Sequence, residues 1–351
     1  MTNKYQKRIE NLSADILQKV GEIDALKAKW VQGAELDREV LTRLKKSVLI
    51  TSTGASTRIE GSKLSDDQVE KLLRGMSIDK FMNRDQQEVA GYYELLTNVF
   101  DSYSSIPFSE STIKFFHREL LKFVEKDKEH RGEYKKKENQ VAMVDAEGIP
   151  VEIVFNPTLA YLAPKEMQEI VEWSQTALIE KKHHPLLIIG NFLIEFLKIH
   201  PFTDGNGRLS RILTNLIMLQ QGFAYMPYIS HEKIVEDNKP EYYIALRQSQ
   251  KTFGTENENI ISWLTFFLRI VLEQSRRAVE LLSRAQTEKL LSPQQEIVWK
   301  YMQKVHDSIP ADISNITKVL RPTVNQALTK LLKLKMIERI GSGRATRYRV
   351  I

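Results

Sequence analysis

The 351-residue sequence contains no cysteine, no long uncharged apolar segment and no signal-like N-terminus. The absence of cysteine excludes disulfides, thiolate metal sites and a cysteine nucleophile. The most apolar stretches, PLLIIGNFLIEFLKI and IISWLTFFLRIVL, contain charged residues and are shorter than the roughly 20 residues that span a bilayer. The first residues, MTNKYQKRIENL, lack the apolar run of a secretory signal. We therefore expect core helices, no membrane partner and a cytoplasmic location.

Acidic residues are scarce at the C-terminal end of the chain. Residues 317–351 contain nine Lys and Arg residues and one Glu. Since the formal net charge of the whole chain is +6, the rest of it is close to neutral. A basic module on a nearly neutral body is a candidate for binding a polyanion.

Apolar residues recur at helical spacing through most of the chain, as in VAGYYELLTNVF and LTNLIMLQQ. One segment differs, because residues 140–144 and 151–155 are β-rich and flank a turn at 145–150. An isolated hairpin is marginally stable in water, so this one must pack on the helical body or serve as a docking edge. The sequence predicts a mainly α protein with one β-hairpin.

The C-terminal segment begins with a new helix, for which Ser292 is the expected N-cap and Pro293 the first residue. Three helices are then followed by the strand MIERI, the loop GSGRA and the strand TRYRVI. This order predicts a winged helix-turn-helix domain. Its basic recognition helix and wing favour nucleic-acid binding, although such domains also mediate protein contacts.

The stretch IHPFTDGNGRLSR, residues 199–211, follows the first of the apolar helices. Pro201 prevents that helix from continuing, and Gly205 and Gly207 allow a tight turn and a close backbone approach. A second helix is expected to start near 206–208. Its first N–H groups have no partners within the helix, so they form an anion site.

Charged side chains surround this predicted anion site. Arg208 and Arg211 are three residues apart on one helix face, so both can reach the same phosphate chain. Asp204 offers the one carboxylate that Mg²⁺ with a nucleotide requires. His200, with an ordinary pKa near 6.5, is placed to take a proton from a hydroxyl. A capped core helix with surface arginines is the alternative, but the number of special residues in register favours a phosphate-handling site.

The same stretch resembles the signature of the Fic family, H-x-F-x-[DE]-G-N-G-R-x-x-R, at every specified position. The resemblance covers about residues 36–273 and implies an all-α core with a small β flap. Most members transfer AMP from ATP to a Ser, Thr or Tyr hydroxyl of a protein and release pyrophosphate. The resemblance implies that His200 is the general base, Phe202 its hydrophobic anchor and Asp204 the Mg²⁺ ligand. It implies that Gly205, Asn206 and Gly207 form the anion hole for the α- and β-phosphates. Arg208 would then contact the β-phosphate and Arg211 the γ-phosphate.

Further segments extend the resemblance. Relatives that phosphorylate have Lys at the second glycine, so Gly207 favours nucleotidyl transfer. Residues 140–155 resemble the family flap, which holds the target segment as an added strand. The segment NKPEYYIAL resembles the lining of the adenine pocket, with Asn238, Tyr242 and Tyr243 as candidates, although aromatic residues at helical spacing are also typical of a core.

Ser56 and Glu60 are four residues apart on a predicted helix that Gly61 can end. A helix end with a solvated Glu is the ordinary interpretation. However, STRIEG resembles the inhibitory motif [ST]-x-x-x-E-[GN] of the class whose inhibitory helix precedes the Fic motif. A Glu60–Arg211 pair would compete with the γ-phosphate. At an effective dielectric constant near 20, charges about 4 Å apart attract by about 4 kcal/mol before desolvation.

We therefore expect three regions: an N-terminal helical region with the inhibitory helix (1–110), a Fic core with its flap at 139–156 (111–275), and a linker helix with the winged-helix domain (276–351). The predicted function is that of an autoinhibited protein adenylyltransferase using ATP and Mg²⁺. One alternative is a winged-helix transcriptional regulator whose Fic unit senses nucleotide or modifies itself, and another is an enzyme that removes AMP. The sequence leaves open which protein is the target, whether the winged-helix domain binds DNA and whether the chain forms a homodimer.

Overall fold

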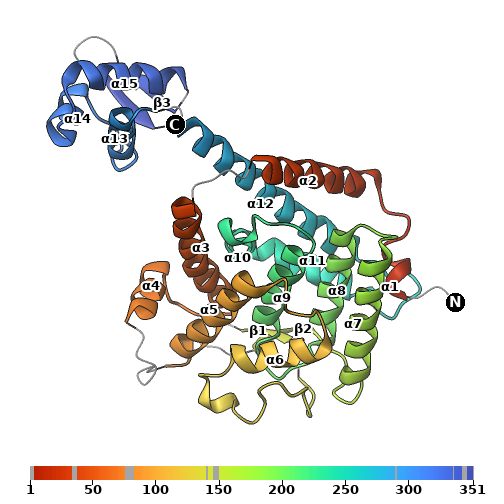
Figure 1. The fold of residues 1–351 in the computed structure, drawn as a ribbon. Coiled ribbons are helices and arrows are strands. Elements are labelled where there is room, and N and C mark those ends of the chain that lie inside the picture. The colour runs from red at the N-terminus through yellow and green to blue at the C-terminus, as the bar shows by residue number, and fades with distance from the viewer. Residues whose placement is uncertain are drawn as a thin grey trace. The chain divides into compact units, whose positions relative to one another are not determined.

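The structure is a computed structural model that describes residues 4–33, 38–75, 83–139, 141–144, 150–288, 291–334, 336–341 and 346–350. Its contacts divide the chain into two compact units, Met1–Val279 and Glu280–Ile351. Helices make up most of the described chain, and the described strands form two-stranded sheets (Figure 1). The predicted mainly α class is confirmed. The boundaries expected at 110 and 275 stay predictions.

The first unit has helices before and after a β-hairpin (Figure 1). Those before it are α1 (Lys4–Lys7), α2 (Ala14–Gly33), α3 (Arg38–Ile59), α4 (Asp66–Arg74), α5 (Arg84–Ser102), α6 (Glu110–Leu120) and the short η2 (Glu125–Asp127). Those after it are α7 (Ala163–Glu180), α8 (Pro185–Ile199), α9 (Asn206–Gln220), the short η3 (Met226–Tyr228), α10 (His231–Asp237), α11 (Lys239–Gln250) and α12 (Ile261–Glu288). The boundary between the units falls inside α12.

Helices α8 and α9 form the centre of the first unit. α8 is apolar on all sides and almost wholly buried, as expected of a helix surrounded by other helices. The charge that interrupts it, Glu195, is buried but paired with Arg8 at 2.7 Å and Lys4 at 3.3 Å. α7 covers α8, while α5 and α6 contact α9. Within the described residues no helix is long and apolar enough to cross a membrane.

Helix α3 brings a distant part of the sequence to this centre. It packs on α5, α9 and α10, and its C-terminal half is buried. Gly61, two residues after the end of α3, has a positive φ of 105°, a conformation that glycine adopts without strain. The N–H groups of Gly61 and Ser62 donate to the carbonyls of Arg58 and Thr57, which closes the helix end.

The predicted β-hairpin is confirmed in its described strands. β1 (Val141–Val144) pairs antiparallel with β2 (Pro150–Phe155), with register shifts after Val141 and after Met143. Pro150, expected in the turn, belongs to β2. Gln140 and residues 145–149 lie outside the described residues.

The second unit contains α13 (Pro293–Met302), α14 (Pro310–Thr317), α15 (Arg321–Lys333), β3 (Ile337–Ile340) and β4 (Arg347–Val350). Ser292 caps α13 as predicted, and it forms a capping box with Gln295. The two strands pair antiparallel, and Ser308 bridges to Tyr348. Apolar side chains from the three helices and β3 form one core, which includes Trp299, Ile313, Leu328 and Ile337. The order of elements is the predicted one, and the winged-helix assignment stays a prediction.

Candidate active site

His200 follows α8 and begins the motif loop, defined here as residues 200–205. Its backbone is left-handed (φ 49°, ψ 60°), and its N–H donates to the Phe196 carbonyl at 2.9 Å. Imidazole Nδ1 lies 3.4 Å from the Leu197 carbonyl oxygen. Because a carbonyl only accepts, this contact assigns the hydrogen to Nδ1 and leaves Nε2 with its lone pair. Burial lowers the pKa of His200 to about 4, so the ring is neutral at pH 7.

The motif loop is closed by the side-chain amide of Asn206, the first residue of α9. Its Nδ2 donates to the Phe202 carbonyl at 2.8 Å, and its Oδ1 accepts from the Phe202 N–H at 3.0 Å. Both residues are buried. Gly205, the N-cap of α9, has a positive φ of 78° that completes the turn. The side chain of Asn206 therefore shapes the loop, while the first N–H groups of α9 remain available for an anion.

His117, on α6, is a second loop-holding residue, which the sequence did not reveal. Its Nδ1 accepts from the Gly132 N–H at 2.9 Å, so its Nε2 carries the hydrogen and donates to the Asp204 carbonyl at 3.0 Å. The ring stacks on Phe202, with centroids 3.9 Å apart and 8° between the planes. Burial lowers the pKa of His117 to about 4. A single His in a helix gives no sequence signal for this role.

Charged residues of α5 extend the site around Asp204. Its Oδ2 accepts from Nη2 of Arg208 at 2.9 Å and from Nη2 of Arg84 at 2.6 Å. Arg208 also pairs with Glu88 at 2.5 Å. Although burial favours the neutral acid, Arg208 and Arg84 hold the pKa of Asp204 below its usual value. Arg84 and Glu88 belong to the site, and neither was apparent from the sequence.

The donor set around Asp204 fits a metal that arrives with phosphates. Within the described residues there is no group of three or more His, Asp or Glu side chains that could hold a metal alone. Mg²⁺ bound to a nucleotide keeps waters and phosphate oxygens and needs only one or two protein carboxylates. The Asp204 side chain is 42% exposed, so its carboxylate is accessible for this role.

Arg211, on α9, is buried and contacts the end of α3. Its Nε donates to the Ser56 hydroxyl at 2.8 Å, and its Nη2 donates to the Ser56 carbonyl at 2.9 Å and to Glu60 Oε1 at 2.7 Å. Although burial opposes the charged form, the Glu60 carboxylate raises the pKa of Arg211. The Glu60 carboxylate also lies against Gly207, where an added Cβ would collide with it. The structure thus brings together the predicted inhibitory residues and the predicted phosphate site.

Arg58 anchors the end of α3 to two other elements. Its Nε and Nη2 donate to the two carboxylate oxygens of Glu236, on α10, at 2.5 and 3.1 Å. Its Nη1 donates to Asp66, on α4, and to the Leu64 carbonyl, both at 2.9 Å. Because Arg58 is two residues before Glu60, these bonds fix the position of the carboxylate at Gly207.

The predicted adenine-pocket residues lie beside this helix end. The hydroxyl of Tyr243 donates to the Ile59 carbonyl at 3.4 Å. Tyr242 is buried next to Arg211, and burial raises the pKa of Tyr242 to about 12. Asn238 joins α10 to α11, accepts from Arg269 at 2.8 Å and donates to the Ile234 carbonyl at 2.8 Å. All three thus have structural contacts, and their contact with adenine stays a prediction.

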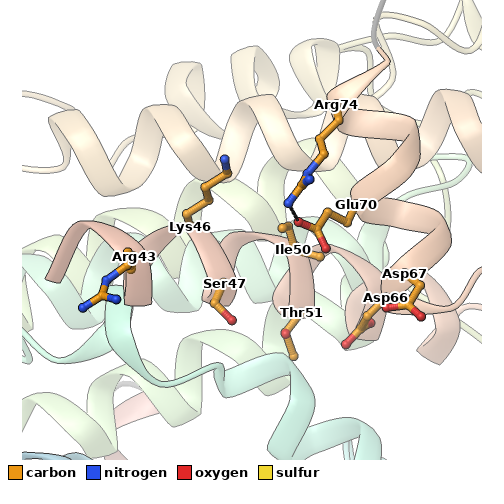
Figure 2. A pocket seen from close by; sticks show the side chains of 9 residues that line it. All are labelled: Arg43, Lys46, Ser47, Ile50, Thr51, Asp66, Asp67, Glu70 and Arg74. Atoms are coloured by element: carbon orange, nitrogen blue, oxygen red, sulfur yellow. Dashed lines mark hydrogen bonds and ion pairs between the residues drawn. The ribbon is translucent and has the colours of Figure 1, made fainter. Parts of the chain in front are cut away.

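A separate cavity of about 300 Å³ lies between α3 and α4. Figure 2 shows basic side chains along α3, acidic side chains on α4 and the Arg74–Glu70 ion pair. The lining residues of the cavity are Arg43, Lys46, Ser47, Ile50, Thr51, Asp66, Asp67, Glu70 and Arg74. Asp66 is the link to the site, because it is also a partner of Arg58.

Several known proteins are similar to this chain in sequence. A probable protein adenylyltransferase of Aquifex aeolicus is 28% identical over 204 residues, which cover 57% of this chain and 54% of that protein. A Fido domain-containing protein of Dictyostelium discoideum is 33% identical over 110 residues, 29% of this chain and 70% of that protein. A protein adenylyltransferase of Caenorhabditis elegans is 33% identical over 95 residues, 26% of this chain. This chain spans about half the length of the Aquifex protein and 17% of the C. elegans protein.

Solved structures share the fold. A Fic family protein from Desulfovibrio desulfuricans is 22% identical with a TM-score of 0.62, covering 97% of both chains. The C. elegans Fic-1 structure is 21% identical with a TM-score of 0.61, covering 78% of this chain and 74% of that one. The sequence model of the Fic/DOC family matches residues 107–218, which include the motif loop and most of α9. The chain belongs to the Fic family.

Proposed function

We propose that the chain is a protein adenylyltransferase that its own helix α3 holds in an inhibited state. The observation that supports this most strongly is the position of Glu60, whose carboxylate lies against Gly207 and pairs with Arg211 at 2.7 Å. A carboxylate at a helix N-terminus, paired with an arginine, occupies a site suited to phosphate. The relatives named protein adenylyltransferase support AMP transfer as the activity of this site.

ATP is the proposed nucleotide substrate. Its α- and β-phosphates would bind at the first N–H groups of α9, where Gly205 and Gly207 allow close approach. Arg208 would contact the β-phosphate and Arg211 the γ-phosphate, while Asp204 would hold Mg²⁺, which neutralises phosphate charge. Arg208 and Arg84 both pair with Asp204, so these three side chains form one cluster.

His200 is the proposed general base. With its hydrogen on Nδ1, Nε2 accepts the proton of the target hydroxyl, and the hydroxyl oxygen attacks the α-phosphorus. The bond between the α-phosphorus and the oxygen bridging to the β-phosphate breaks, and pyrophosphate leaves. The products are an AMP ester of the target side chain and pyrophosphate. The lowered pKa of His200 keeps the base unprotonated near pH 7.

Glu60 is the proposed inhibitor because it competes with the γ-phosphate for Arg211. A buried arginine that loses its carboxylate partner is strongly destabilised, so the γ-phosphate and Glu60 would replace one another at Arg211. The target segment would dock on the edge of the β1–β2 hairpin through main-chain hydrogen bonds, which tolerate many target sequences. The target, which includes the chain itself as a candidate, is a protein with a Ser, Thr or Tyr hydroxyl.

The test compares wild type and Glu60→Gly with ATP labelled at the α-phosphate. We expect at least about a 10-fold increase in protein labelling by Glu60→Gly, because a coupling of about 1.4 kcal/mol already corresponds to tenfold. Glu70→Gln, which removes a surface pair on α4, serves as the control and should behave as wild type. Equal labelling by wild type and Glu60→Gly would contradict autoinhibition. Labelling from γ-labelled ATP would instead indicate phosphorylation.

Removal of AMP is a second candidate for the same site, because Glu60 also lies where it could position a water molecule next to the phosphate site. The wild-type protein is incubated with a target that Glu60→Gly has modified. Release of AMP by wild type, and its absence with Glu60→Gln, would support this activity.

Nucleic-acid binding by the second unit is proposed from one face of α15. Arg321, Asn325, Thr329 and Lys333 are exposed at intervals of four residues, and α15 contains no carboxylate. Two β4 arginines, by contrast, are paired: Arg347 with Asp307 and Arg349 with Glu338. Filter binding to duplex DNA at increasing salt tests the proposal. We expect retention at low salt that weakens in Arg321→Gln/Lys333→Gln, and no retention at any salt would favour a protein-contact role.

A further inference from the structure

Lys135 lies directly behind His200, in the segment between η2 and β1. Its backbone N–H donates to the Pro201 carbonyl at 2.8 Å, and its Nζ donates to the Ile199 carbonyl at 3.1 Å. One residue therefore holds the carbonyls on both sides of His200. Lys135 is only 4% exposed, which is unusual for a lysine.

His200 needs such support because its conformation is costly. In the left-handed region the Cβ of a residue lies too close to the following carbonyl oxygen, which makes this conformation unfavourable for any residue other than glycine. Ile199 is the last residue of α8, whose terminal carbonyls have no partners within the helix. The ammonium of Lys135 satisfies the Ile199 carbonyl and places a positive charge at the helix C-terminus, where it is favourable.

The same ammonium also reaches the next part of the motif loop. Lys135 Nζ donates to Asn139 Oδ1 at 2.8 Å, and Asn139 Nδ2 donates to the Phe202 carbonyl at 3.2 Å. Within the described residues, Lys135 has no ion pair with a carboxylate closer than 4 Å. Burial lowers the pKa of Lys135 to about 8, while Glu138 and Glu166 act against that decrease and Lys198 adds to it.

Three charged groups act on the imidazole from the elements around it. Burial has the largest effect, and the Lys135 charge further lowers the pKa of His200, whereas Glu60 on α3 and Asp204 in the motif loop raise it. Removing the Lys135 charge should therefore raise the pKa of His200. This change reports the Lys135 charge beside the imidazole and can be followed without enzyme activity.

We propose that Lys135 is a positioning residue that fixes the peptide groups on both sides of His200 and thereby directs its imidazole toward the target hydroxyl. This inference rests on the proposed role of His200 as the base. The hydrogen bonds of Lys135 go to the carbonyls of Ile199 and Pro201 and to Asn139, so its proposed effect on catalysis passes through His200 and the loop that holds it.

The first experiment measures AMP transfer by full-length Lys135→Met and Lys135→Arg, each in the Glu60→Gly background. We expect Lys135→Met to lower kcat by about 10- to 100-fold, since small misplacement of a reacting group has effects of this size. KM for ATP should change less than about twofold, because the substitution leaves the proposed nucleotide contacts unaltered. Lys135→Arg, which retains charge and donors, should recover most of the rate. Lys136→Met, at the exposed neighbouring position, is the control.

The second experiment does not require activity. The imidazole signals of the histidines are titrated by NMR in wild type and Lys135→Met, and His200→Ala assigns the His200 signal. We expect the pKa of His200 to rise in Lys135→Met; an unchanged His200 titration would overturn the inference. If Lys135→Met does not fold, Lys135→Gln replaces it.

The two proposals fail separately. An inactive Glu60→Gly parent would contradict the proposed function and leave the NMR titration to decide on Lys135. An active parent whose kcat is unaffected by Lys135→Met would overturn the role of Lys135 and leave the proposed function intact.

Discussion

The motif loop and the end of α3 meet at the start of α9, where Gly207 lies against Glu60, yet they are held by different kinds of interaction. The loop is fixed by buried hydrogen bonds and ring stacking: the Asn206 amide on Phe202, His117 stacked on Phe202 and bonded to Asp204, and Lys135 bonded to the carbonyls on both sides of His200. The end of α3 is fixed by charge pairs of Arg58 and Glu60, whose side chains are 21% and 33% exposed.

This difference indicates which side of the contact can move. Buried hydrogen-bonded networks are rigid, because any broken bond leaves an unsatisfied polar group. Partly exposed ion pairs are weaker and screened by salt, and water or another anion can replace either partner. We infer that the motif loop stays fixed, whereas the end of α3, with the proposed inhibitory residue Glu60, can be released. Arg211 would then exchange the Glu60 carboxylate for a phosphate.

The largest expected effect is on the fixed side. In the Glu60→Gly background, His200→Ala should reduce AMP transfer by at least about 100-fold, the usual lower contribution of a general base. Because the proposed phosphate contacts come from α9, nucleotide binding measured by calorimetry should stay within a few-fold of the parent. Transfer at the parental rate would mean that another group removes the proton, and the loop would lose its assigned role.

The next effect concerns the stability of the loop. The pKa of His117 falls from 6.5 in the unfolded chain to about 4 in the fold, so the unfolded chain binds more protons between these values. The stability contributed by neutral His117 is complete above about pH 6.5 and is lost as the pH falls toward 4. At pH 5, about 1.5 pH units below 6.5, the loss is about 2 kcal/mol.

Urea unfolding of wild type and His117→Gln at pH 7 and pH 5 measures this contribution. The decrease in unfolding free energy between the two pH values should be smaller in His117→Gln by about 2 kcal/mol. Identical decreases would show that His117 is not kept neutral by the fold, and the loop would then resemble the α3 end more than we infer.

The sequence revealed those features of the site that depend on local chemistry. Pro201 and the glycines mark the loop, and the periodicity of α8 and α9 marks the helices on either side. The motif residues from His200 to Arg211 and the proposed inhibitory residue Glu60 were each predicted because they form short patterns with fixed spacing. Ser292 at the start of α13 is a further example, since a cap is specified by its own neighbours.

The residues that the sequence did not reveal act across long separations. Arg84, Glu88, His117 and Lys135 lie 64 to 120 positions before the residues they hold and belong to no short pattern of their own. Their roles depend on how α5, α6 and the segment before β1 pack on α9 and the loop, which a single sequence does not specify. For Tyr242, the local sequence pattern predicted a position near the site but did not predict its contact with Arg211.

The smallest expected effect is on the releasable side, at Arg58. Arg58→Gln removes the pairs with Glu236 and Asp66 but leaves the Glu60 and Arg211 side chains unaltered. Partly exposed pairs contribute about 0.2–1 kcal/mol each; if about half of the two contributions opposes release of Glu60, AMP transfer should rise about 1.5- to 5-fold, less than in Glu60→Gly. Arg74→Gln, which breaks the Glu70 pair on α4, is the matched control and should leave the rate unchanged. If Arg58→Gln transfers AMP at the wild-type rate while Glu60→Gly is active, the Glu60–Arg211 pair alone maintains the proposed inhibited state. The ion pairs of Arg58 would then stabilise the fold without regulating the site.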